Sequence, residues 1–277
     1  MEVIAQIPEL RRRLEQAGRI AFVPTMGNLH EGHLSLVRMA KAHADTVVVS
    51  IFVNPLQFGA NEDLANYPRT LQADCEKLAQ AEADIVFTPT ESELYPSPQT
   101  IQIEPSPIAN QLCGAHRPGH FKGVCTVVAK LFNIVQPQVA CFGSKDFQQL
   151  FILREMVSQL NMPIDMLAGE TIREQDGLAM SSRNGYLKPA QRLEAPRLYR
   201  ALQQVVTAVQ KGNRDFDAIE TQTAQYLTQL GWIVDYIVIR SAATLLTPVP
   251  EEQKLIVLGA ARLGSTRLID NIEFCTA

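Results

Sequence analysis

Residues 46–53 read TVVVSIFV and carry apolar side chains at both the odd and the even positions. A strand with this pattern is buried on both faces, which is typical of a parallel sheet covered by helices on its two sides. We therefore predict a parallel sheet with this strand at its centre.

The chain around this strand, up to about residue 170, alternates short β-rich runs with longer segments of helical periodicity. Alternation of this kind indicates βαβ units. We predict an α/β fold with a Rossmann-like, doubly wound parallel sheet. Further strands are expected at 20–24, 84–88, 138–143 and 163–168, and helices at 1–18, 33–44, 71–82, 123–135 and 147–160.

The order of predicted helices and strands changes after residue 170. Helices expected at 191–211 and 215–230 precede strand-like runs at 232–241 and 254–274. Helices followed by strands indicate a smaller α+β domain. The predicted domains are therefore residues 1–170 and residues 171–277.

The composition excludes several classes of partner. Lys and Arg total 25 and Asp and Glu total 29, so a net charge of −4 gives no footprint for nucleic acid or anionic lipid. No apolar run approaches the roughly 18–20 residues that span a bilayer. Five scattered cysteines without a paired spacing favour a reduced, cytoplasmic location.

The stretch 22–34, FVPTMGNLHEGHL, joins the first of these strands to the next helix. Ligands of doubly wound sheets bind at this carboxyl edge. Gly27 and Gly32 allow the backbone to approach a ligand, and His33 lies in the first helical turn, where free N–H groups favour an anion. An imidazole N–H at this place can donate to a phosphate oxygen.

A P-loop, a dinucleotide-binding loop and a zinc site fit the sequence of this stretch less well. Gly27 and Gly32 have P-loop spacing, but His33 and Leu34 stand in place of Lys and Ser or Thr, and no G-x-G-x-x-G follows the strand. His30 and His33 lack the cluster of further ligands that a zinc site needs. Two histidines at this spacing are often structural, but the flanking glycines favour a binding role.

Two more strand ends carry polar groups. The stretch 143–149, GSKDFQQ, offers Lys145 as a cation for a triphosphate, Asp146 as a helix N-cap and Gln149 in the first helical turn. After the central strand, Asn54 and Gln57 supply amides that suit a hydroxylated substrate. Asn54 followed by Pro55 is equally consistent with a simple turn.

A fourth stretch, 176–184, reads DGLAMSSRN and lies between the two predicted domains. It could be a polar linker turn. Its hydroxyls and Arg183 could also close over phosphates and neutralise charge as pyrophosphate leaves.

Six segments resemble those of pantothenate synthetases in order and spacing, and the likeness spans nearly the whole chain. These are PTMGNLHEGHLSLV (24–37), SIFVNPLQFG (50–59), YPRTLQAD (67–74), HRPGHFKGV (116–124), CFGSKDFQQL (141–150) and DGLAMSSRNGYL (176–187). Residues 258–274 also look like the C-terminal strand region of that family. The resemblance implies a nucleotidylyltransferase with a His-x-Gly-His signature and a homodimer. It also implies that the Rossmann-like domain, residues 1–170, binds ATP and pantoate and that residues 171–277 form a C-terminal lid.

The resemblance also implies site residues. His33, Lys145 and Arg183 would be catalytic, with Gln57, Gln149 and Asn54 on pantoate. Magnesium is implied with the triphosphate, and Asp74 is a weak candidate contact whose alternative is a solvated helix residue. ATP contacts would come from Met26, Gly27, Asn28, Leu29, His30, Glu31, Gly32, His33, Gly143, Ser144, Lys145, Asp146, Ile172, Met180, Ser181, Ser182 and Arg183.

There are two small departures from the family pattern. Ser144 stands where Glu or Gln would be expected, and Asn28 occupies a position that varies. The implied reaction is the ATP-dependent joining of pantoate to β-alanine through an adenylate. Two alternatives remain: another small-molecule nucleotidylyltransferase that leaves the nucleotide on its product, and a nucleotide-binding sensor without catalysis.

Overall fold

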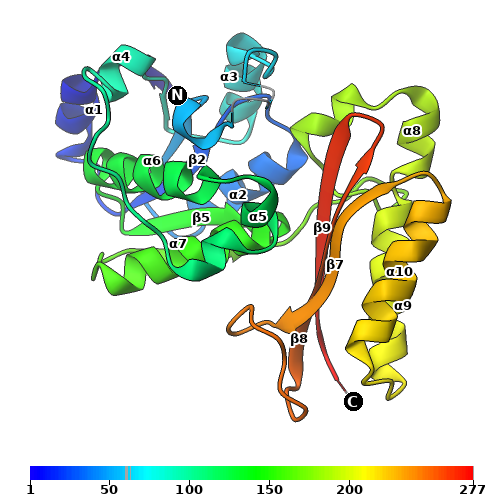
Figure 1. Cartoon of the computed structure of the whole chain (residues 1–277). Helices are drawn as coiled ribbons and strands as arrows, with labels where there is room; N and C mark the ends of the chain where they lie inside the picture. Colours follow the sequence, from blue (N-terminus) through cyan, green and yellow to red (C-terminus); the bar gives the residue numbers. More distant parts are fainter. Residues whose placement is uncertain (60–61, 63, 277) are drawn as a thin grey trace. The chain divides into compact units, whose positions relative to one another are not determined.

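The computed structural model describes residues 1–59, 62 and 64–276. Its contacts divide the chain into two compact units, coloured along the sequence in Figure 1. The first comprises residues 1–144 and 148–170, and the second comprises residues 145–147 and those from 171 onward. Residues 145–147 are thus assigned to the second unit although the residues on either side of them along the chain belong to the first.

The first unit contains a parallel sheet of six strands in the order β1-β4-β3-β2-β5-β6, counted within the described residues. The strands are β1 Glu2–Ile4, β2 Ile20–Thr25, β3 Thr46–Ile51, β4 Ile85–Phe87, β5 Val139–Gly143 and β6 Asp165–Gly169. The expected parallel sheet is confirmed, with β3 beside β2 at its centre.

The helices between these strands are α1 Ile7–Leu14, α2 Glu31–Lys41, α3 Leu71–Gln80, α4 Glu91–Leu94, α5 Cys113–His116, α6 His120–Val135 and α7 Phe147–Gln159. Short 3₁₀ turns are η1 Pro55–Gln57, η2 Pro107–Asn110 and η3 Ser144–Asp146.

Helices pack on both faces of this sheet. Val23 of β2 belongs to a buried cluster with Val37 of α2. On the opposite face Phe22 meets the ring of Phe132 in α6, with centroids 6.3 Å apart in an edge-on arrangement. Because neighbouring residues of a strand point to opposite faces, burial on both sides explains why the central strands β2 and β3 are almost entirely apolar. The sheet is doubly wound, as expected.

The strand order reverses between β2 and β5. From β2 the chain moves through β3 to β4, whereas β5 and β6 are added on the other side of β2. In open parallel sheets the crevice at such a switch point, outside the carboxyl ends of the strands, is where ligands bind. Here that edge is formed by the residues that follow Thr25 and Gly143.

Two sequence-based predictions of secondary structure are wrong. The sequence predicts one helix over residues 1–18, but Glu2–Ile4 form β1, which pairs with β4, and the helix begins only at Ile7. The helix expected at 191–211 is interrupted at Pro196, which has no N–H for the helical ladder.

The second unit is a three-stranded antiparallel sheet with helices, counted within the described residues, and confirms the expected α+β class. Its core joins the apolar face of α9 to the sheet, as Leu202 of α9 and Ile239 of β7 are both buried in it. The elements are η4 Ser182–Tyr186, α8 Pro189–Glu194, α9 Arg197–Gln210, α10 Phe216–Gln229, β7 Ile233–Ser241, β8 Lys254–Leu263 and β9 Thr266–Cys275.

Helix α6 lies unusually close to η1 in the first unit. A Cβ atom on Gly123 would lie 2.1 Å from the backbone oxygen of Leu56. We expect Gly123→Ala to lower the free energy of unfolding by about 1–3 kcal/mol, because backbone on both sides leaves no room to relax. Urea denaturation measures this. Gly143→Ala, where no atom lies within 4 Å of the added carbon, is the matched control and should change stability little; equal effects would contradict the close approach.

Within the described residues, no helix is both long enough and apolar enough to cross a membrane. The cysteines, Cys75, Cys113, Cys125, Cys141 and Cys275, are all free thiols.

Candidate active site

The loop after β2 is held by one buried carboxylate. Asp74 of α3 has an exposed fraction of 0%. Its Oδ2 accepts from the backbone N–H of Asn28 and its Oδ1 from that of Leu29, both at 2.8 Å, while Thr70 Oγ1 donates to Oδ2 at 3.0 Å. The interpretation of Asp74 as a solvated helix residue is therefore wrong. A metal contact stays a prediction, but both carboxylate oxygens already accept hydrogen bonds.

The backbone of this loop requires the residues found there. Gly27 has φ of 84° and Asn28 has φ of 51°, two successive residues in the left-handed region. Glycine adopts this region freely, and Asn is among the few other residues that tolerate it. A Cβ on Gly27 would also lie 3.2 Å from Asp74 Oδ2. Tight turning at these two positions directs the consecutive amides of Asn28 and Leu29 toward the carboxylate.

His30 and His33 form a reciprocal cap at the start of α2. Gly32 N–H donates to His30 Nδ1 at 3.2 Å, and His30 N–H donates to His33 Nδ1 at 3.3 Å. A neutral imidazole that accepts at Nδ1 carries its proton on Nε2. The two rings, with centroids 4.1 Å apart, therefore both have Nε2–H as their donor. Glu31, the first residue of the helix, pairs with Arg38.

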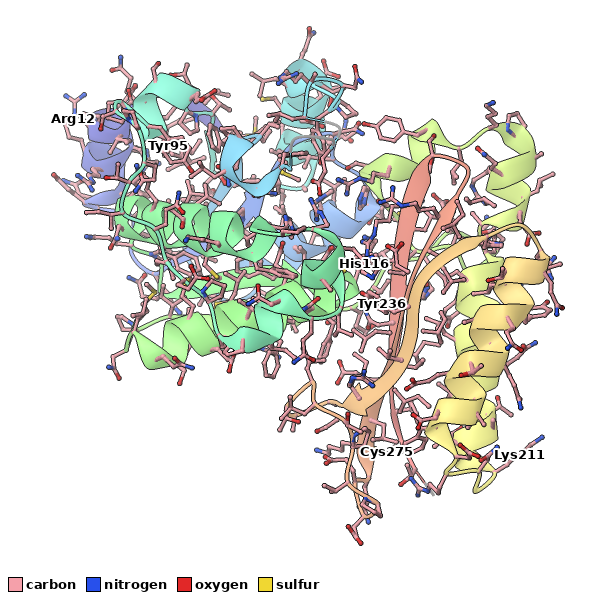
Figure 2. All side chains as sticks on the ribbon, in the orientation of Figure 1. Arg12, Tyr95, His116, Lys211, Tyr236 and Cys275 are labelled. Carbon is pink, nitrogen blue, oxygen red and sulfur yellow. The ribbon has the colours of Figure 1, made fainter. Side chains whose placement is uncertain are left out.

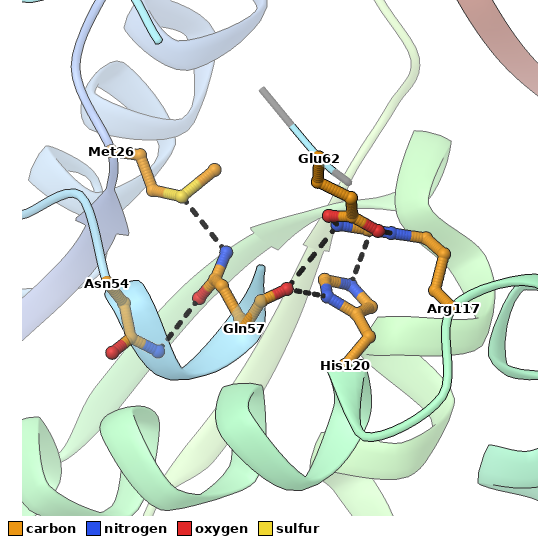
Figure 3. A network of polar contacts seen from close by, with 6 residues as sticks. All are labelled: Met26, Asn54, Gln57, Glu62, Arg117 and His120. Carbon is orange, nitrogen blue, oxygen red and sulfur yellow. Dashed lines mark hydrogen bonds and ion pairs between the residues drawn. The ribbon is translucent and has the colours of Figure 1, made fainter. Parts of the chain in front are cut away.

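A second cluster lies where β3 ends (Figure 3). Asn54 Nδ2 donates to Gln57 Oε1 at 3.2 Å, and Gln57 Nε2 lies 2.9 Å from Met26 Sδ. Thioether sulfur is a weak acceptor, so an oxygen of a bound substrate would be a better partner for this amide. The structure thus brings together three residues expected at the site, from the loops after β2 and β3.

Tyr95 fixes the amide of Asn54. Its hydroxyl donates to Asn54 Oδ1 at 2.9 Å (Tyr95 is labelled in Figure 2). Burial, with the charge of Glu91 as a smaller cause, raises the pKa of Tyr95 to about 12. The phenol therefore stays protonated at neutral pH and remains the donor. This contact was not foreseen, because Tyr95 lies 41 positions away along the chain.

Neighbouring glutamines at the start of α7 have different roles. Gln148 is buried and its side chain bonds the backbone of Ile108, Gln111 and Cys113 at 2.8–3.0 Å. Gln149 is half-buried and its side chain makes no hydrogen bond with the described part of the chain. It lies in the first turn of α7, which follows the carboxyl end of β5 after the short turn η3.

Lys145 and Asp146 lie in the short turn η3, between β5 and α7. The Lys145 ammonium lies 3.7 Å from Asp146 Oδ2, and the Lys145 carbonyl accepts a hydrogen bond from Asn271 Nδ2 at 2.9 Å. The β9 strand of the second unit therefore holds this residue.

The expected phosphate-contacting segment of the second unit begins beside Ile172. Met180 N–H donates to the Ile172 carbonyl at 2.9 Å. Ser181 caps η4, since its hydroxyl accepts from Arg183 N–H, and Ser182 is the first residue of that turn.

Two ion pairs hold the residues that lead into this segment. Arg173 makes two hydrogen bonds to Asp270 at 2.7 and 2.9 Å and lies over the ring of Tyr199 at 3.6 Å. The Arg192 guanidinium bonds Asp176 and holds the pKa of that carboxyl below its usual value. The stretch is therefore an ordered turn.

The family model for pantoate–β-alanine ligase matches residues 2–273. This chain belongs to the pantoate–β-alanine ligase family. A pantothenate synthetase of Methylobacillus flagellatus is 66% identical over 274 residues, 99% of both chains.

Two solved structures of the pantoate–β-alanine ligase family agree with the fold. The pantothenate synthetase of Thermus thermophilus superposes with a TM-score of 0.93 at 42% identity, covering 98% of this chain and 99% of that one. The enzyme of Francisella tularensis, described as complexed with β,γ-ATP and β-alanine, gives a TM-score of 0.83 at 34% identity, covering 98% and 97%.

Proposed function

We propose that this chain joins pantoate to β-alanine at the expense of ATP, forming pantothenate, AMP and pyrophosphate through a pantoyl adenylate. The observation that carries the proposal is the switch-point edge. There His30 and His33, each with an Nε2–H donor, lie at the start of α2. The amide cluster of Asn54 and Gln57 lies beside them. Membership of the family and the ATP and β-alanine named for the Francisella relative support it.

The first half-reaction needs positioning more than a base. The carboxylate of pantoate is ionised at neutral pH, so one of its oxygens can attack the α-phosphorus directly, and the bond to the pyrophosphate oxygen breaks. Gln57 and Gln149 would orient pantoate for in-line attack. His33, with Lys145 and Arg183, would stabilise charge on the phosphates.

The second half-reaction forms the amide. The free amine of β-alanine attacks the activated carbonyl, the bond to AMP breaks, and the nitrogen loses a proton to water or phosphate. The sequence offers no evident base for this amine, so the rate should follow the titration of the amine itself. A rate set by a protein group titrating near neutrality would contradict this.

Magnesium would enter with the nucleotide. No group of three or more His, Cys, Asp or Glu side chains suited to a metal occurs among residues 1–59, 62 and 64–276. The residues therefore do not fit a dedicated protein site, and magnesium bound mainly by phosphates and water is the usual arrangement for this ion. For Asp74 we propose the structural role of holding the Asn28–Leu29 turn.

We further propose that residues 1–170 bind ATP and pantoate while residues 171–277 act as a lid that brings Met180–Arg183 to the phosphates. Protection of this segment from hydrogen exchange when ATP and pantoate are added tests the lid, and unchanged exchange would contradict it. A homodimer in the cytoplasm is consistent with the family and with the free thiols. Light scattering decides the oligomeric state.

Product analysis tests the proposed function. Incubation with ATP, magnesium, pantoate and β-alanine should give pantothenate and AMP in equal amounts by mass spectrometry. A product that retains the nucleotide would identify a different nucleotidylyltransferase. ATP binding without turnover would favour a sensor.

The two glutamines of α7 give a matched pair. We expect Gln149→Ala to raise the KM for pantoate about tenfold with little change in thermal stability, because one hydrogen bond to substrate is lost. Gln148→Ala should instead lower the free energy of unfolding by about 1–3 kcal/mol, since three backbone groups lose their partner. Steady-state kinetics and urea denaturation of both variants measure this. The opposite pattern would contradict the assignment.

A further inference from the structure

The segment HRPGHFKGV (residues 116–124) carries polar groups to which the proposed reaction assigns no role. It packs against η1, the short turn that ends in Gln57. Arg117 and His120 contact the carbonyl of Gln57 in that turn (Figure 3). Gly123 accepts a hydrogen bond from Asn54, the residue that caps the turn.

The sequence R-P-G-H explains how Arg117 and His120 come together. Proline at the second position and glycine at the third are typical of a type II turn, which needs positive φ at the third. Gly119 has φ of 79° and ψ of −8°, and His120 N–H donates to the Arg117 carbonyl at 3.1 Å. The turn therefore places the side chains of its first and last residues side by side.

The guanidinium of Arg117 contacts three groups, because its Nη2 also lies 3.5 Å from the Gln57 carbonyl. Its Nε and Nη2 bond the two carboxylate oxygens of Glu62 at 2.7 and 2.6 Å, and its Nη1 lies 2.8 Å from His120 Nε2. A bidentate pair of this kind fixes both distance and plane. Glu62 thus orients the guanidinium toward the imidazole.

These contacts fix the tautomer of His120. A guanidinium has only donors, so His120 Nε2 must accept the bond from Arg117. The proton of the neutral ring then lies on Nδ1, which donates to the backbone carbonyl of Gln57 at 2.8 Å. His120 is 8% exposed and Gln57 is 9% exposed, so water competes little for either group.

The other side of Gln57 is fixed as well. Asn54 Nδ2 bonds both Gln57 Oε1 and the carbonyl of Gly123 at 3.2 Å. Because Gly123 has no side chain, α6 can approach η1 closely. The backbone of Gln57 is thus bonded by His120, and its side chain is held by Asn54.

We infer that Glu62, Arg117 and His120 form a positioning relay for pantoate binding, in which Arg117 selects the Nδ1–H tautomer of His120 and that tautomer anchors the carbonyl of Gln57. The inference rests on the proposed role of Gln57 in holding pantoate. Its consequence is specific: losing the bond from His120 to Gln57 weakens pantoate binding and leaves ATP binding unchanged.

Two substitutions of His120 separate the two ring nitrogens. In His120→Asn the amide occupies the place of Nδ1 and can still donate to Gln57. In His120→Gln it occupies the place of Nε2, so it accepts from Arg117 but cannot anchor the carbonyl. We expect the KM for pantoate to rise about tenfold in His120→Gln and to stay within about threefold in His120→Asn, with the KM for ATP unchanged in both.

Further variants keep the test decisive. Arg117→Lys retains a cation but cannot bond Glu62 and His120 together, so its KM for pantoate should also rise, by about three- to tenfold. His116→Gln, an exposed histidine of the same segment, is the control and should change neither KM. Melting temperatures show whether each variant folds, and if His120→Gln does not fold, Arg117→Lys carries the test.

The possible outcomes are distinct. Equal effects of His120→Asn and His120→Gln, or equal changes in the KM for ATP and for pantoate, would overturn the relay. An unchanged KM for pantoate in Arg117→Lys would also overturn it. If the wild-type chain forms no AMP from pantoate and β-alanine, the proposed function fails instead.

Discussion

Replacing His33 by asparagine is expected to lower the rate of pantoate-dependent pyrophosphate release by about 10²- to 10³-fold. Asn can still accept the bond from His30 N–H that His33 Nδ1 now accepts, so the helix cap is preserved. The variant lacks only the Nε2–H donor. The lost rate therefore reports stabilisation of the phosphates by that proton.

Other variants isolate this effect. His33→Gln places an amide N–H near the position of Nε2 and should recover part of the rate. His43→Asn, on an exposed histidine at the end of the same helix region, should leave the rate unchanged. Single-turnover measurement of pyrophosphate release compares the variants. A His33→Asn enzyme within about threefold of wild type would contradict a role for Nε2–H.

Asp74→Asn is expected to be the most damaging single-atom change to the loop after β2. An amide offers one acceptor oxygen where the carboxylate has two, so at least one of the donors from Asn28, Leu29 and Thr70 loses its partner. Buried donors without acceptors cost about 1–3 kcal/mol each. We expect the free energy of unfolding to fall by about 2–3 kcal/mol and the KM for ATP to rise about tenfold.

Glu76→Gln provides the control for this substitution. Glu76 is an exposed carboxylate on the same helix, and its replacement should stay within about 0.5 kcal/mol of wild type. Urea denaturation and ATP saturation curves measure both quantities. If Asp74→Asn leaves the stability unchanged but abolishes the dependence of activity on magnesium concentration, Asp74 acts as a metal ligand and the structural role is wrong.

The periodic part of the fold could be predicted from the sequence. β3 is predictable because a doubly buried strand is apolar at every position that its neighbours cover, and α2 because its apolar face repeats with the helical period. β1 was missed because a strand of three residues has no period to detect. Its pairing with β4, some 80 positions away, stabilises it.

The chemistry of the site was only partly predictable. Polar residues at strand ends pointed to Gln57 and His33, because parallel strands bring their carboxyl ends to one edge. Asp74 could not be assigned its role from local sequence, since its partners Asn28 and Leu29 lie 46 and 45 positions away. The same holds for His120 and Gln57, which are 63 positions apart. Hydrogen bonds between distant segments need the tertiary fold.

The most direct test of the account follows the two half-reactions separately. Wild-type chain is mixed with ATP, magnesium and pantoate, and pyrophosphate is measured before and after β-alanine is added, with His33→Asn in parallel. We predict one equivalent of pyrophosphate with pantoate alone, AMP only after β-alanine, and neither at a comparable rate in the variant. Pyrophosphate release that requires β-alanine, or that proceeds without pantoate, would contradict the account.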